Sequence, residues 1–324
     1  MSFTSSRVAL VTHSGKFHCD EVFGYVVLCL ALGLSRLGED HTLLRTRKPD
    51  LIEAGDIVFD VGGRFDPDSN RFDHHQIGAP QREDGTPYSA AGLLWQVYGE
   101  RAVAALLSEQ DASKFAPRIA AELDGGLVKR LDEIDNGVCM SGPVQRNSLD
   151  LAALIGDFNP SWDSPAASGP TAGDDAFLQA AALARQTLSL KVEGLRARFL
   201  ADSLVMAAHE AAQDPRLLVL ETGMPWKNVI FKQDLPVLLC VSPASNGNWM
   251  IDTMPPEPGS FAQRLPFPES WAGLQGEDLA KVCGVEDAVF VHVRRFVGAA
   301  KTREGAVLMA RKIIDQAQSQ AQGE

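Results

Sequence analysis

The sequence predicts an α/β fold with two domains, each built from a sheet and covering helices. Short apolar, β-branched runs alternate with longer segments of helical periodicity, which is typical of βαβ units with a largely parallel sheet flanked by helices. Histidine and aspartate residues directly follow several of these runs. Because α/β proteins place their chemistry at the carboxyl ends of strands, these residues mark the expected site.

The first half of the chain carries the elements of the larger domain. The predicted strands cover residues 8–12, 42–46, 56–61 and 71–73. The predicted helices cover residues 21–34, 89–107 and 114–133. The first strand ends immediately before His13, and the last delivers His74 and His75. Gly137 is a stop signal after the third helix, so Asp135 is expected at a helix end.

The second half begins with a change in composition. Residues 159–175 are rich in Pro, Ser, Gly and Ala and lack an apolar period, which predicts a surface loop. A long amphipathic helix is predicted over residues 176–212, before Asp214 and Pro215 break the pattern. Strand-like runs follow at 217–220, 237–241 and 288–293. We therefore expect a first domain over residues 1–213 and a smaller α/β domain over residues 214–324.

Composition narrows the class of protein. The chain has 324 residues, of which 45% are hydrophobic and 22% charged, as in a soluble globular protein. Its net charge of −12 argues against a protein that coats long nucleic acid, although metal ions and a few basic side chains can still accept a phosphate or a short oligonucleotide. The apolar run at 22–34 is shorter than the roughly 20 residues of a membrane span, and residues 1–9 lack a signal pattern. Five scattered cysteines without a CxxC suit a reducing compartment, so we expect a cytoplasmic protein with no membrane segment.

A set of side chains in the first half has the types and order that a pair of metal ions requires. They are His13, His18, Asp20, Asp60, His74 and Asp135. Imidazole and carboxylate ligands without a thiolate suit Mn²⁺, Mg²⁺ or Co²⁺ better than structural zinc. Asp60 lies in the middle of the set at a predicted strand end, so it is the expected bridge between two ions. Taken singly, each residue could instead cap a helix or shape a turn.

Four motifs in the first half carry a family resemblance. They read THSGKFHCDE (12–21), DVGG (60–63), FDHHQ (72–76) and IDNG (134–137). Together they resemble the DHH phosphoesterase superfamily and, within it, the melanocyte-proliferating-gene family of metal-dependent hydrolases. Three segments of the second half, at 223–231, 259–279 and 290–306, are similar to that family's C-terminal segments. The resemblance therefore covers the whole length, whereas a lone DHH would be a weak match.

The resemblance implies a DHH-type metal-binding catalytic domain, a C-terminal substrate-binding domain and an active site in the cleft between them. It implies that one ion is held by His13, His18 and Asp60, and the other by Asp20, Asp60, His74 and Asp135. The chain departs from the superfamily at His18, where a carboxylate is usual. It also lacks the C-terminal GGGH motif, and the segment around His292 and Lys301 takes its place, with Arg295 where family members commonly have Gly.

Two ions that share Asp60 imply hydrolysis of a phosphoester or phosphoanhydride by a metal-activated water. His75 would face the substrate and donate to a phosphoryl oxygen or to the leaving group, so Asp60 and His75 are the expected catalytic residues. Candidates to neutralise phosphate charge are Lys16, Arg45, His292, Arg294 and Lys301. For Lys16, Arg45 and Arg294, a solvated surface cation is an equal alternative.

Three functions are open at this point. The resemblance favours a Mn²⁺-dependent 3′ to 5′ exonuclease on short RNA or DNA, because eukaryotic members of the family are associated with RNA degradation. The second is a small-molecule phosphohydrolase, either a nucleotide phosphatase or an enzyme similar to the manganese inorganic pyrophosphatases, which have a denser cluster of Lys and Arg than this sequence shows. The third is a protein that binds metal without catalysis, for which the acidic net charge is the main support.

Overall fold

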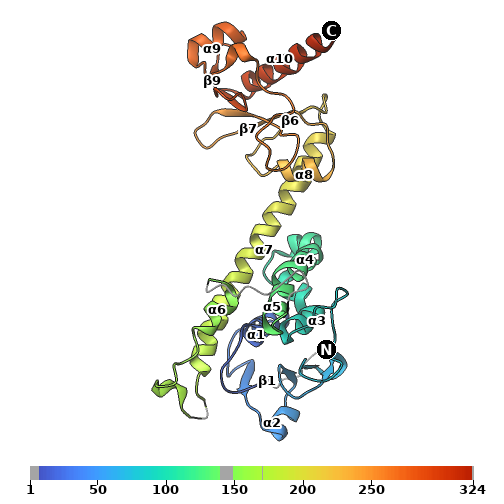
Figure 1. Ribbon diagram of the computed structural model, residues 1–324, viewed down its shortest axis with the longest axis vertical. Coiled ribbons are helices and arrows are strands. Elements are labelled where there is room, and N and C mark those ends of the chain that lie inside the picture. Colours follow the sequence, from blue (N-terminus) through green and yellow to red (C-terminus); the bar gives the residue numbers. More distant parts are fainter. Residues whose placement is uncertain (1–6, 139–148, 170, 323–324) are drawn as a thin grey trace. The chain divides into compact units, whose positions relative to one another are not determined.

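A computed structural model describes residues 7–138, 149–169 and 171–322 of the chain (Figure 1). By internal contacts the chain divides into two compact units, residues 1–196 and 197–324. Each unit has its own five-stranded sheet with packed helices, so the α/β class predicted from the sequence is confirmed. The boundary falls inside the long helix α7 (Asp174–Glu210).

The sheet of the first unit has the strand order β2-β1-β3-β5-β4. Its strands are β1 (Val8–Thr12), β2 (His41–Arg45), β3 (Ile57–Phe59), β4 (Phe65–Asp66) and β5 (Arg71–Phe72). β1 pairs in parallel with β2 and β3, and β3 pairs in parallel with β5, whereas β4 is antiparallel. The carboxyl ends of β1, β3 and β5 therefore meet at one edge of the sheet.

Helices accompany this sheet on both faces. They are α1 (Cys19–Leu32), α2 (Pro49–Glu53), α3 (Ala90–Ala104), α4 (Glu109–Leu123), α5 (Lys129–Asp135) and α6 (Leu151–Gly156). Because side chains alternate along a strand, Val58 of β3 packs with Val11 and with Ile52 of α2, while Phe59 faces α1 at Gly24. α1 and α3 pack against each other, and α1 also contacts α5 and α6.

One predicted helix is interrupted. The periodicity predicts a single helix over 114–133, but α4 ends at Leu123 and Asp124–Val128 form a π-helical turn before α5 begins. The adjacent Gly125 and Gly126 lie in that turn and have the backbone freedom that such irregular turns use. α5 ends at Asp135, as the sequence predicts.

The second unit has a mixed sheet with the order β6-β7-β8-β10-β9. Its elements are β6 (Leu217–Val219), α8 (Lys227–Lys232), β7 (Leu239–Pro243), β8 (Trp249–Thr253), α9 (Gly276–Cys283), β9 (Ala288–Val291), β10 (Val297–Ala300) and α10 (Arg303–Gln322). Only β6 and β7 are parallel. α10 packs on one face of the sheet and α9 packs on β9 (Figure 1). On the other face, Val205 from the end of α7 packs with Leu218 and Trp226.

Candidate metal centre

Three strand ends bring the predicted ligands together in the first unit. β1 ends at Thr12 and is followed by His13, and β3 ends at Phe59 and is followed by Asp60. β5 ends at Phe72, before Asp73, His74 and His75. Because β1, β3 and β5 are parallel neighbours, these side chains meet at a single edge of the sheet.

The segment after His13 turns into the N-terminus of α1. Gly15 has φ +101°, a left-handed value that glycine adopts without steric cost, and His18 is the N-cap residue. The backbone N–H of His18 donates to both carboxylate oxygens of Glu21, each at 2.9 Å. The turn therefore places Asp20 and Glu21, both fully buried, at the positive end of the helix dipole.

Asp60 is at the middle of the site. Its backbone has φ +54°, a region that few residues other than glycine adopt, and its N–H donates to the carbonyl of Phe72 at 3.1 Å. Its two carboxylate oxygens point to different partners: Oδ2 lies 3.2 Å from His13 Nε2, and Oδ1 lies 3.3 Å from His74 Nε2. Asp60 therefore contacts two of the predicted metal ligands, His13 and His74, at once.

Asp135 approaches from the C-terminus of α5, and its Oδ2 lies 3.4 Å from His74 Nε2. The ligand atoms form three groups, and within each group they lie no more than 4.8 Å apart. The first cluster is His13, His18, Glu21 and Asp60; the second cluster is Asp60, His74 and His75; the third cluster is His18, Asp20 and Asp135. All six predicted ligands are therefore gathered, and the clusters could hold metal ions.

The buried carboxylates of the site require a compensating positive charge. Burial alone lowers the pKa of His13, but hydrogen bonds with Asp60 and Glu21 outweigh it and raise that pKa to about 10. Burial alone raises the pKa of Asp60, but hydrogen bonds from His13 and His74 outweigh it and lower that pKa to about 2. In the absence of an ion, the protonated His13 ring therefore neutralises part of the carboxylate cluster.

Asp20 is the clearest sign that a ligand is expected here. It is 1% exposed, and among the described residues neither of its carboxylate oxygens has a hydrogen-bond partner. Burial and the nearby Asp60 and Asp135 raise the pKa of Asp20 well above its ordinary value. A buried carboxylate without a partner is costly and requires a proton or a cation. The donor set of this site fits a divalent ion.

Two residues that were not among the predicted ligands also belong to the site. Glu21 accepts from His13 Nε2 at 2.8 Å and brings a carboxylate to the first cluster. Asp73, 2% exposed, accepts from His75 Nδ1 at 2.7 Å and from the backbone N–H of His74 at 2.8 Å. With Nδ1–H donating to Asp73, Nε2 is left as the free nitrogen of the exposed His75 ring. In the sequence, the sign that these two residues belong to the site is that Glu21 directly follows Asp20 and Asp73 directly precedes His74.

The five predicted phosphate-binding cations lie in different surroundings. Arg45 is buried: it donates to Asp174 Oδ1 at 3.1 Å and to the carbonyls of Gly15 and Ala172, and it lies over Phe17 at 5.4 Å. Lys16 is exposed on the loop after His13. His292, Arg294 and Lys301 belong to the second unit, where His292 Nδ1 accepts from the backbone N–H of Arg294 at 3.1 Å. Their roles in substrate binding remain predictions.

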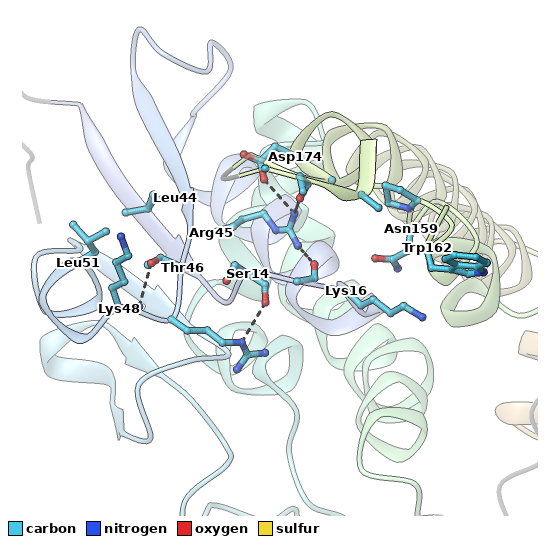
Figure 2. A pocket seen from close by; sticks show the side chains of 17 residues that line it. Ser14, Lys16, Leu44, Arg45, Thr46, Lys48, Leu51, Asn159, Trp162 and Asp174 are labelled. Atoms are coloured by element: carbon cyan, nitrogen blue, oxygen red, sulfur yellow. Dashed lines mark hydrogen bonds and ion pairs between the residues drawn. The ribbon is translucent and has the colours of Figure 1, made fainter. Parts of the chain in front are cut away.

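Two cavities adjoin the clusters within the first unit. One, of about 410 Å³, is lined by His18, Asp20 and Asp135 together with Asp150 at the start of α6. Cys19 also lines it; this thiol is buried, and burial raises its pKa. The other, of about 800 Å³, lies beside the loop that follows His13 (Figure 2).

Fold and site together define an α/β protein whose first sheet carries, at its carboxyl edge, partly buried clusters of His, Asp and Glu that could bind metal ions. The family model MYG1_exonuc, described as an uncharacterised protein family (UPF0160), matches residues 9–314. The chain is 33% identical to a MYG1 protein of Caenorhabditis elegans over 94% of both chains. It is 31% identical to a MYG1 protein of Schizosaccharomyces pombe over 96% of this chain and 98% of that protein.

A third relative is the MYG1 exonuclease of Homo sapiens, with 30% identity over 94% of this chain and 85% of the human protein. The chain belongs to the MYG1 family, which confirms the resemblance drawn from its motifs. No solved structure matches the chain. None of the described helices is both long and apolar enough to span a membrane.

Proposed function

We propose that this chain is a metal-dependent phosphodiesterase that shortens short RNA or DNA strands from the 3′ end. The observation that carries the proposal is the overlap of the three clusters, in which Asp60 belongs to two and His18 to two. Overlapping ligand sets are what a pair of neighbouring ions needs. The name of the human relative, MYG1 exonuclease, supports a nucleic-acid substrate.

The donor types of the clusters suit divalent ions, and we infer two of them, with Mn²⁺ as the preferred metal and Mg²⁺ or Co²⁺ as alternatives. His13, His18 and Asp60 would hold one ion, and Asp20, Asp60, His74 and Asp135 the other. In the family resemblance, His18 takes a position where a carboxylate is usual. Glu21 lies in the same cluster and supplies a negative charge there.

When bound, the two ions would supply an activated water and stabilise charge on the attacking and leaving oxygens. Asp60 and His75 are the proposed catalytic residues. Asp73 holds the His75 ring through Nδ1, which leaves Nε2 as the nitrogen that would donate to the leaving oxygen. His75 can reach a substrate from outside, because its side chain is 62% exposed.

Binding of the strand requires cations outside the metal clusters. Lys16, beside His13 on an exposed loop, is the best placed of the predicted set in the first unit. Arg45 has most of its donors engaged within the protein and would act mainly by shaping the loop at Gly15. In the second unit, His292, Arg294 and Lys301 are proposed contacts for the remaining phosphates.

The test is Mn²⁺-dependent degradation of a 5′-labelled short RNA by the purified protein, with release of phosphate from pyrophosphate assayed beside it. We expect stepwise shortening of the RNA that EDTA abolishes. Asp60→Asn should lower the rate by more than about 100-fold, a larger loss than is usual for a residue that only orients a metal ligand. Asn tolerates the left-handed backbone of Asp60, so the variant removes charge while keeping the turn.

Two outcomes would contradict the proposal. Intact RNA together with phosphate release from pyrophosphate would identify a small-molecule phosphohydrolase. Absence of turnover of both substrates, in a protein that still binds Mn²⁺, would identify a metal-binding protein without this activity.

A further inference from the structure

The larger cavity of the first unit has a charge opposite to that of the whole chain. It is about 800 Å³ in volume, within the range of about 300–1,000 Å³ typical of ligand sites. Its lining includes Lys16, Arg45, Arg47 and Lys48, against one acidic residue, Asp174. Asp174 is paired with Arg45 at 3.1 Å. The whole chain has a net charge of −12, whereas the lining of this basic cavity is mainly positive and therefore favours an anion.

The three remaining cations are available to a ligand. Lys16, Arg47 and Lys48 are exposed, and within the described ranges none of them forms an ion pair with a carboxylate. Arg47 links the basic cavity to the candidate metal centre, because its Nη2 lies 3.1 Å from His13 Nδ1 and its Nε donates to the carbonyl of Ser14 at 3.2 Å. An anion at Arg47 would therefore lie next to the first cluster.

Apolar surface lies beside these cations. The Trp162 side chain lines the basic cavity and is 92% exposed, although Trp is a residue that proteins usually bury. Leu44 and Leu51 line the cavity as well and are 38% and 40% exposed. Figure 2 shows Lys48 and Leu51 at one end of the cavity and Trp162 at the other, with Ser14 and Lys16 between them. An occupant that touches both ends must be elongated.

Resting on the proposed function, we propose that the basic cavity binds the part of a single-stranded nucleic acid that adjoins the scissile phosphate. Lys16, Arg47 and Lys48 contact successive phosphates, and Trp162 stacks on a base. Cations that follow a backbone together with an aromatic platform are the common means of binding single strands without sequence preference. Pyrophosphate has no planar apolar part, so it would leave the surface of Trp162, Leu44 and Leu51 without a partner.

Binding of a 5′-fluorescein-labelled single-stranded RNA, measured by fluorescence anisotropy in EDTA, tests the site without turnover. Trp162→Ala should weaken binding about tenfold, within the range for loss of one stacked base. The double variant Lys16→Ala/Lys48→Ala should lower the slope of log K against log salt by about 1.4, at about 0.7 for each cation removed. Matched controls on α7 are Leu190→Ala, which removes a 63% exposed apolar side chain, and Lys191→Ala; both should bind like the natural chain.

A cleavage assay separates this site from the metal centre. With Mn²⁺, the ratio of RNA cleavage to hydrolysis of bis(p-nitrophenyl) phosphate should fall about tenfold in Trp162→Ala, since the small diester lacks the strand that the basic cavity would bind beside the scissile phosphate. Unchanged RNA affinity and an unchanged salt slope in the variants would overturn the site, even if the RNA is cleaved. An equal loss on both substrates would overturn it too. If the natural chain cleaves no RNA, the proposed exonuclease fails, and the anisotropy measurement still decides whether the cavity binds a strand.

Discussion

Asp60 shows how one residue can organise a site. The chain leaves β3 at Asp60 with a left-handed backbone, which Asp tolerates better than most residues. That conformation, fixed by the hydrogen bond to Phe72, places one carboxylate oxygen near His13 and the other near His74. Backbone strain of this kind persists where the surroundings fix it and is concentrated at functional sites.

Glu21 provides the sharpest prediction at the residue scale. Its carboxylate contacts His13 and also caps α1 through the backbone of His18. Glu21→Gln keeps the size of the side chain and an oxygen that can accept the cap hydrogen bond, but it removes the negative charge from the first cluster. We expect Mn²⁺ affinity to fall about 10- to 100-fold in a calorimetric titration.

The control for this experiment is Glu53→Gln, which removes an exposed carboxylate from α2 and should leave Mn²⁺ affinity unchanged. If Glu21→Gln binds Mn²⁺ as tightly as the natural chain, Glu21 serves only as a helix cap. A drop in thermal stability without a change in affinity would lead to the same conclusion.

Much of the candidate site could be predicted from ligand types at strand ends. His13, Asp60 and His74 each directly follow a strand or lie within two residues of its end, and parallel pairing then brings them together. Glu21 and Asp73 were not assigned, because an acid at the start of a helix or before a histidine usually caps backbone groups. Only the tertiary arrangement directs Glu21 to His13 and Asp73 to His75.

At the scale of elements, the position of Asp135 depends on how α5 packs against the start of α3. Asp132, one turn before Asp135, is completely buried and accepts hydrogen bonds from Ser89 N–H and Ser89 Oγ at 2.9 and 2.7 Å. Arg82 completes the network at 2.7 Å from Asp132 and also pairs with Asp124. Removing one member of a buried ion pair is strongly destabilising, so this network holds α5 in place.

Gly92 of α3 tests this packing. A Cβ added there would lie 2.6 Å from Asp132 Oδ2 and 2.7 Å from Tyr88 Cδ1. Gly92→Ala should therefore destabilise the protein by about 1–3 kcal/mol, the usual cost of overpacking, although alanine is the better helix former. The free energy of unfolding can be measured by urea denaturation.

Gly194 in α7 is the matched control, because a Cβ there meets no described atom within 4 Å. Gly194→Ala should stabilise the protein by about 0.5–1 kcal/mol, from helix propensity alone. The prediction fails if both substitutions shift the unfolding midpoint in the same direction.

Elements with a strong hydrophobic period were predicted well. Short strands without such a pattern were not. The long helix expected over 176–212 is α7 at Asp174–Glu210. The sequence pattern did not predict β8 and β10, the strands that make the second sheet mainly antiparallel. β10 reads VGAA, with small side chains and a glycine, and so lacks the β-branched pattern of a strand. β10 is a strand because it pairs with β8 and β9, and its local sequence does not indicate that pairing.

At the scale of the whole molecule, the first unit (residues 1–196) holds several negatively charged side chains close together. Asp20, Glu21 and Asp60 are all buried, and they belong to the three overlapping clusters at one edge of the sheet. Without an ion, protons must carry part of the compensating charge, which is why the pKa of His13 is raised. A metal ion held by the proposed ligands would therefore compete with protons for the same buried groups.

The sign of the resulting pH dependence follows from His13. Its pKa rises from 6.5 to about 10 on folding, so in the metal-free protein its pairing contributes fully to stability below about pH 6.5 and is lost as the pH rises through about 10. An ion held by His13 would require the neutral ring, so its binding would release a proton throughout the neutral range. Each proton released strengthens apparent Mn²⁺ binding by about 1.4 kcal/mol per pH unit.

We therefore expect Mn²⁺ to raise the melting temperature more at about pH 8 than at about pH 6. At a free concentration of about 100 times Kd, the stabilisation is about 2.7 kcal/mol, and it grows with pH as Kd falls. Differential scanning calorimetry at the two pH values measures the effect, and titrations in two buffers of different ionisation enthalpy count the protons released. Asp60→Asn, in which the shared carboxylate is lost, should show little shift at either pH. An equal shift at both pH values in the natural chain, with no proton release, would mean that Mn²⁺ binds away from His13 and its cluster.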